Sequence, residues 1–146
     1  MKRNLLWLLP PLAVIVLMMA LAFQPTREEQ ARELFVRDRA ALEEMAQQVL
    51  KGETVLPPKP WKNVVLYDRS IRTVEFELGS AGFGSETSYW GINYVPSNSH
   101  MVGFQGQQWD YWKAHKNGRL YYDPEGDNTC YVVRLDECWY YYEMKF

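Results

Sequence analysis

The sequence predicts an α+β protein: an N-terminal transmembrane helix and one juxtamembrane helix, followed by a compact antiparallel β-meander domain of about seven short strands. Three observations support this fold class. An uncharged apolar run lies near the N-terminus, apolar residues then recur every three or four positions, and beyond residue 61 they alternate with polar residues between turn signals. We divide the chain into a transmembrane anchor or signal peptide (1–24), a juxtamembrane amphipathic helix (25–52), a Pro-rich connector (53–60) and an antiparallel β domain (61–146).

The apolar run covers residues 4–23, and no charged residue occurs between Arg3 and Arg27. A helix needs about 20 apolar residues to cross the hydrocarbon core of a bilayer, so the run is long enough to span it. The alternative is a cleaved secretory signal that ends at the A-x-A site of residues 20–22. The unbroken length of the run favours a single-pass anchor in the cell membrane, with the C-terminal domain outside the cytoplasm, whereas cleavage would make the domain secreted.

The segment after the run has the pattern of one amphipathic helix. Thr26 and Glu29 have the spacing of a capping box, and Gly52 marks the end of the helix. Its apolar positions are Ala31, Leu34, Phe35, Ala41, Leu42, Met45, Ala46 and Val49. This stripe either packs on the sheet of its own domain, which we favour, or pairs with a second copy of the chain as a juxtamembrane coiled coil. The prolines of the connector cannot continue the helix.

Short segments typical of β-strands follow one another through the rest of the chain. The candidate strands are 63–67, 72–78, 88–95, 101–105, 108–115, 119–122, 129–135 and 138–146. The sharpest turn signal between them is Asn117-Gly118, because a type I′ hairpin turn needs positive φ at both central residues. Successive strands joined by short turns predict an antiparallel meander. On the last strand, the set expected to face the core is Cys138, Tyr140, Tyr142, Met144 and Phe146.

Charge and cysteine content restrict the partners of the chain. A formal net charge of −2 and a pI near 5.7 argue against a nucleic-acid partner, which would call for a basic patch. The two cysteines, Cys130 and Cys138, predict a disulfide if the domain is exported, and the alternative is a pair of free thiols. A zinc site would have to recruit His100 and His115, whose positions do not match the spacings of structural zinc sites.

No motif in the sequence predicts catalysis. The glycines of residues 79–84 resemble a phosphate-binding loop, but a strand pattern follows them where such a loop would open a helix. The acidic run 123–128 lacks the ligand spacing of an EF-hand and is expected to form a solvated turn. There is no nucleophile elbow and no HExxH motif. We therefore predict a protein that is not an enzyme, with no catalytic residue, no cofactor and no bound metal.

Aromatic residues carry most of the functional information. They make up 15% of the chain, more than one small sheet face easily buries. The candidate binding surface consists of Trp109, Tyr111, Trp112, Trp139 and Tyr141. We expect a non-catalytic binding module that presents these side chains to a protein or a cell-wall glycan. Two alternatives stay open. Two sheet layers, or a sheet and the helix that begins after Thr26, bury most of the aromatic side chains, which is slightly favoured over their exposure. Otherwise the protein is an assembly subunit that pairs through its juxtamembrane helix.

Overall fold

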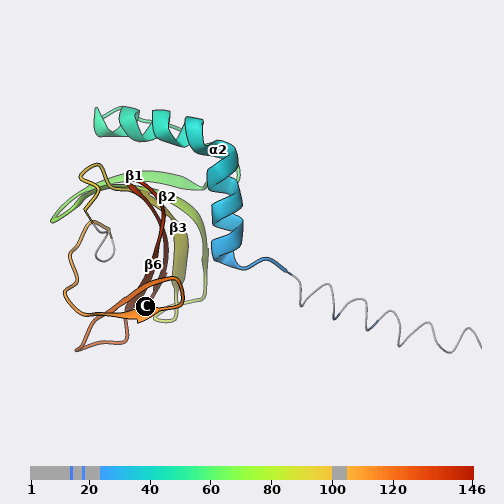
Figure 1. Cartoon of the computed structure of the whole chain (residues 1–146), viewed down its shortest axis with the longest axis vertical. Coiled ribbons are helices and arrows are strands. Elements are labelled where there is room, and N and C mark those ends of the chain that lie inside the picture. The colour runs from blue at the N-terminus through green and yellow to red at the C-terminus, as the bar shows by residue number, and fades with distance from the viewer. Residues whose placement is uncertain (1–13, 15–17, 19–23, 100–104) are drawn as a thin grey trace, which may run out of the picture.

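The computed structural model describes residues 24–99 and 105–146, together with Val14 and Met18. In these ranges one helix is followed by seven strands, all of which belong to a single antiparallel sheet (Figure 1). The elements are α2 (Arg27–Leu50), β1 (Asn63–Asp68), β2 (Arg72–Ala81), β3 (Ser88–Tyr94), β4 (Trp112–His115), β5 (Gly118–Tyr122), β6 (Thr129–Asp136) and β7 (Trp139–Lys145). The described part of the chain is therefore mostly β-sheet.

The transmembrane part of the predicted fold class is not supported. Among the described residues, no helix combines the length and the apolar character needed to cross a membrane. The predicted span, residues 4–23, lies outside the described residues apart from Val14 and Met18. We therefore correct the fold class to a β-sheet domain with one helix. Export of this domain stays a prediction.

The helix α2 has the boundaries that its local sequence predicts. The Thr26 side chain accepts a hydrogen bond from the Glu29 N–H at 3.2 Å, and the Glu29 carboxylate accepts one from the Thr26 N–H at 2.7 Å, which completes the capping box. Beyond the C-terminal end of α2, Gly52 adopts a φ of 86°. The buried side chains of α2 are Ala31, Phe35, Leu42, Met45, Ala46 and Val49, and they pack on the sheet of the same domain, as predicted.

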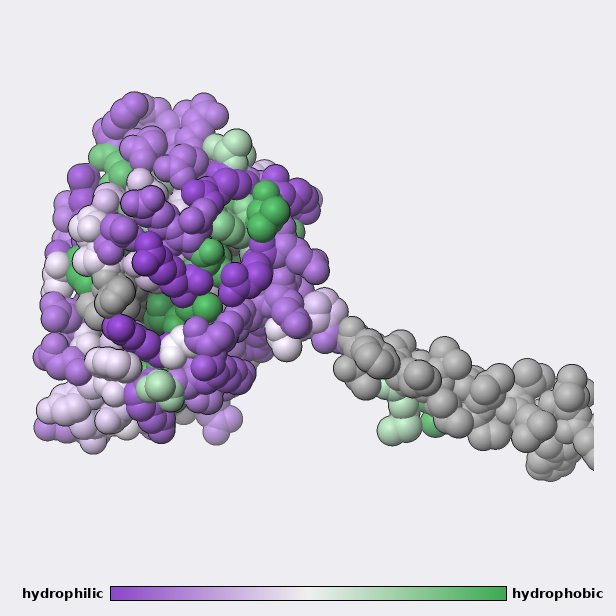
Figure 2. Space-filling model, in the orientation of Figure 1, coloured by the Kyte–Doolittle hydropathy of each residue, from purple (hydrophilic) through white to green (hydrophobic). Residues whose placement is uncertain are grey.

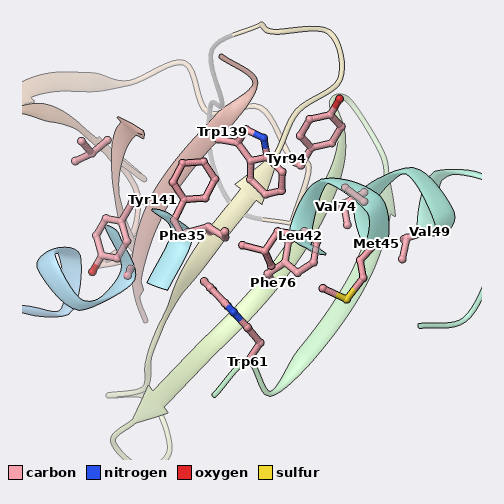
Figure 3. Packing of buried hydrophobic residues seen from close by; sticks show 14 of the residues in the cluster. Phe35, Leu42, Met45, Val49, Trp61, Val74, Phe76, Tyr94, Trp139 and Tyr141 are labelled. Carbon is pink, nitrogen blue, oxygen red and sulfur yellow. The ribbon is translucent and has the colours of Figure 1, made fainter. Parts of the chain in front are cut away.

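The helix lies on the outer, convex side of a strongly curved sheet, and it bends along that side (Figure 1). The largest group of buried residues fills the space between the two layers (Figure 3). Trp139 is at its centre, with ring centroids 5.3 Å from Phe35, 5.8 Å from Phe76 and 4.9 Å from Tyr94. The Trp139 indole N–H also donates a hydrogen bond of 3.1 Å to the Glu43 carboxylate, so burial leaves its polar atom satisfied.

The opposite side of the sheet, which we call the concave face, carries a second cluster. Its buried members are Val95, Tyr121, Cys130, Val132, Tyr140, Tyr142 and Met144. Strand β7 supplies residues to both clusters, because alternate side chains of a strand point to opposite faces. The prediction that Tyr140, Tyr142 and Met144 face a core is confirmed, but the other face of β7 is buried as well.

The sheet is not a simple meander. Its strand order is β1-β2-β3-β7-β6-β5-β4, so β3 pairs with β7 rather than with the next strand in sequence. The chain between Tyr94 and Trp112 is too long for a hairpin turn, and this leaves the edge of β3 free for β7. The predicted strand 101–105 lies outside the described residues except for Gln105, which is in a turn.

The predicted disulfide is wrong, because neither Cys130 nor Cys138 is in a disulfide. Cys130 pairs with Met144 across β6 and β7, whereas Cys138 lies in the turn that joins these strands. The two cysteines are thus at opposite ends of the hairpin, roughly 20 Å apart for a rise of about 3.3 Å per residue. A disulfide needs Cα atoms within about 7 Å of each other.

Replacing the central tryptophan should destabilise the domain strongly. Because Trp139 is 0% exposed and contacts three aromatic rings, we expect Trp139→Ala to lower the free energy of unfolding by about 3–5 kcal/mol. Trp112→Ala removes the same residue type from an edge strand, where the side chain is 48% exposed, and should cost less than about 1 kcal/mol. Urea denaturation followed by circular dichroism measures both values, and equal losses would contradict this core.

The two thiols should differ in reactivity without any reducing agent. Burial raises the pKa of the Cys130 thiol, with the Glu75 carboxylate adding to the effect, so this thiol stays protonated and inaccessible. Cys138 is only partly buried. At pH 8, a thiol-specific dye should therefore label Cys138 in the folded domain and Cys130 only after unfolding in guanidinium chloride. Labelling of either thiol that first requires a reductant would instead indicate a disulfide.

Candidate functional site

The five aromatic residues of the predicted binding surface do not form one surface. Trp139 and Tyr141 are both 0% exposed and belong to the cluster beneath α2, which corrects the prediction that they are available to a partner. Trp109 is partly buried against the cluster of the concave face. Tyr111 and Trp112 are exposed, with 54% and 48% of their surface accessible.

Tyr111 and Trp112 lie at the edge of the sheet, where the chain enters β4, and they belong to opposite faces. Trp112 pairs with Tyr121, a buried residue of the concave face. Tyr111 contacts Tyr122 instead, with ring centroids 6.1 Å apart, and its carbonyl oxygen accepts a hydrogen bond of 3.1 Å from the Tyr122 N–H. The two exposed rings therefore cannot stack on the same ligand.

The Tyr111–Tyr122 pair borders a cavity of about 400 Å³, which we call the aromatic pocket. It lies between the segment that precedes β4 and the turn between β5 and β6. The pocket is lined by Gln107, Gln108, Trp109, Asp110, Tyr111, Tyr122, Asp123, Pro124 and Asn128. It thus brings together the aromatic stretch around Trp109 and the acidic run 123–128, which the sequence pattern treats as separate features.

The acidic run forms an ordered turn that holds one wall of the pocket. The Asp123 N–H donates a hydrogen bond of 3.1 Å to the Asn128 carbonyl oxygen, and the Asp123 carboxylate accepts one of 3.0 Å from the Glu125 N–H. Within the described residues, no group of three or more histidine, cysteine, aspartate or glutamate side chains is arranged to hold a metal ion. Asp123 therefore fixes the turn that forms this wall.

Acceptors and carboxamides dominate the polar lining of the pocket. Asp110 and Asp123 supply carboxylates, while Gln107, Gln108 and Asn128 supply groups that both donate and accept hydrogen bonds. The Gln108 side chain donates a hydrogen bond of 3.4 Å to Asp110. Among the described lining residues there is no lysine, arginine or histidine. The pocket therefore suits an uncharged ligand with many hydroxyl groups better than an anion.

Sequence reasoning missed Tyr122, Gln107 and Asn128 as parts of the site. The signal that could have found Tyr122 is the predicted hairpin at Gly118. In a hairpin the residues before one strand lie opposite the end of the other, which brings Tyr111 next to Tyr122. Comparisons of this chain with protein-family models, with curated proteins and with solved structures find no match.

Proposed function

We propose that the chain is a non-catalytic binding module whose aromatic pocket holds a sugar ring of a glycan. The observation that carries this proposal is the pair of the exposed Tyr111 and the partly buried Tyr122 beside carboxamide and carboxylate side chains in one cavity. Binding sites of this kind combine an apolar platform with a few polar groups that fix the orientation of the ligand.

The platform supplies the apolar part of the interaction. The face of an aromatic ring carries a negative partial charge, which attracts the weakly positive C–H groups on the flat side of a sugar ring. Tyr111 is half exposed and lies against Tyr122, so its position is restricted before a ligand binds. A pre-ordered ring loses little conformational entropy on binding.

The polar wall supplies selectivity for hydroxyl groups. Each sugar hydroxyl both donates and accepts hydrogen bonds, and the Gln107, Gln108 and Asn128 carboxamides can answer both roles. Asp110 and Asp123 accept hydrogen bonds and repel anions. We therefore favour a neutral oligosaccharide over an acidic one.

Two other functions have less support. A protein partner would call for a larger continuous apolar patch, whereas Tyr111 and Trp112 belong to opposite faces of the edge strand. Assembly through α2 would need the apolar stripe of this helix to be available to a partner. The buried side chains of the stripe are instead packed on the sheet of the same chain.

Tyr111→Ala should weaken glycan binding at least about 10-fold, because it removes the exposed half of the platform. We would titrate the domain calorimetrically with the hexamer of N-acetylglucosamine and with cellohexaose. Trp112→Ala is the matched control, since it removes a similarly exposed ring from the other face of the same edge and should leave the affinity unchanged.

The urea midpoint of both variants should stay close to that of the parent chain, so that a loss of binding is not a loss of fold. An equal loss of affinity in Tyr111→Ala and Trp112→Ala would contradict the assignment to the aromatic pocket. Absence of binding to both oligosaccharides at 10 mM, taken as roughly the weakest affinity of interest, would contradict the proposed function.

A further inference from the structure

A second cavity, distinct from the aromatic pocket, opens on the concave face beside β1 and β2. Its volume is about 670 Å³, and we call it the concave cavity. It is lined by Asn63, Tyr67, Glu75, Glu77, Gly84, Thr87, Tyr89, Gln105, Gln107 and Phe146. The Gly106 carbonyl oxygen accepts a hydrogen bond of 2.9 Å from the Ile71 N–H, which ties the segment that carries Gln105 and Gln107 to the turn between β1 and β2.

Hydrophilic residues (purple) surround apolar ones (green) on the side of the molecule that faces the viewer (Figure 2). The concave side of the curved sheet lies away from α2 (Figure 1).

Among the described residues, none donates a hydrogen bond to one of the two oxygen atoms of the Glu75 carboxyl group. Glu75 is only 7% exposed, and in the described part of the chain its Oε2 atom receives no hydrogen bond. The register of the sheet places Asn93 next to Glu75 on β3 and Val65 next to it on β1. A buried acceptor without a donor costs free energy, and a ligand that supplies the donor recovers it.

The charge of the cavity has one sign. Glu75 and Glu77 lie two residues apart on β2, so their side chains point to the same face. Among the described residues that line the cavity, none is a lysine, an arginine or a histidine. Tyr67 and Tyr89 add aromatic rings, whose faces attract cations. Both the charge and the rings select a cationic ligand.

We propose that the concave cavity binds a small alkyl amine, whose ammonium group donates a hydrogen bond to Glu75 Oε2 while the Glu77 carboxylate faces the same space. A primary ammonium fits better than a quaternary one, because only N–H groups satisfy the unpartnered oxygen. A second amino group on the same ligand would have Glu77 as its partner, so a short diamine is the best match to the two carboxylates. Amine binding at this site does not require the proposed glycan function.

The protonation of Glu75 makes amine binding depend on pH. The pKa of Glu75 is raised to about 7, mainly because the group is buried; the nearby Tyr142 hydroxyl lowers this pKa, and the Glu77 carboxylate adds to the rise. The other titratable groups that face Glu75 are Tyr67 of β1, Cys130 of β6 and Tyr142 of β7, and burial raises the pKa of each, so they remain neutral near pH 7. Asn93, Gln105 and Gln107 do not titrate.

The sign follows from the charge of Glu75. Above pH 7 the carboxylate is ionised and attracts an ammonium group, whereas below pH 7 it is protonated and does not. An alkyl amine stays protonated throughout this range. With the pKa of Glu75 near 7, lowering the pH from 8 to 5.5 should weaken amine binding on the order of 30-fold.

Calorimetric titration of the whole chain with 1,5-diaminopentane tests the proposal, and 1,5-pentanediol is the uncharged probe of equal length. At pH 8 we expect the diamine to bind and the diol to fail. Glu75→Gln removes the charge but keeps the size of the side chain, so the fold should persist while the affinity for the diamine falls at least about 10-fold and loses its pH dependence. Glu53→Gln, which removes one charge from an exposed position, should change neither.

Equal binding of the diol and the diamine would overturn the proposal, and so would unchanged diamine affinity in Glu75→Gln. Failure of the diamine to bind at 10 mM, roughly the limit of a useful affinity, would overturn it as well. The Tyr111→Ala variant should bind the diamine like the parent chain, because Tyr111 does not line the concave cavity. This result separates amine binding from the proposed glycan site.

Discussion

The packing of Trp139 between α2 and the sheet is the interaction on which the rest of the structure depends. Its ring touches Phe35 of α2, Phe76 of β2 and Tyr94 of β3, and its N–H group reaches Glu43 of α2. One side chain of β7 therefore joins four elements. Because α2 covers the convex side, both cavities are left to the open side and the edge of the sheet.

Local features of the fold could be predicted from the sequence. The capping box fixed the start of α2, and periodicity placed the starts of β1, β2, β3 and β6 correctly, because these signals depend only on residues that are near in sequence. The order of the strands depends on distant segments, and no local pattern indicates that β7 lies beside β3. The pairing of Cys130 and Cys138 failed for the same reason, since the register decides which residues meet.

Gly118 shows how a correct observation can lead to a wrong mechanism. The Asn117-Gly118 dipeptide predicted a turn with both residues at its centre, but His115 pairs with Gly118, so the central residues are Lys116 and Asn117. A Cβ atom on Gly118 would lie 2.2 Å from the Val132 carbonyl oxygen. The glycine is required by the close approach of β6, which cannot be deduced from a dipeptide.

The candidate sites were only partly predictable for a related reason. The aromatic stretch identified Tyr111 correctly. Trp112 lies on the opposite face of the sheet edge, and Trp139 and Tyr141 are buried, so these three residues are not part of the pocket. Glu75 has no sequence signal, because its role depends on the curvature of the sheet and on what covers it. Gln107 lines both cavities, so the two candidate sites share one side chain of the segment before β4.

The position of β7 in the centre of the sheet also restricts the order of events during synthesis. The strands β1 to β3 and β4 to β6 form two separate groups whose facing edges, β3 and β6, have no partner until β7 has been made. Until then Phe35 of α2 also lacks Trp139, the ring against which it packs. A nascent chain without β7 therefore exposes two strand edges that can pair with other chains. Rapid synthesis of β7, or protection of these edges, prevents such aggregation.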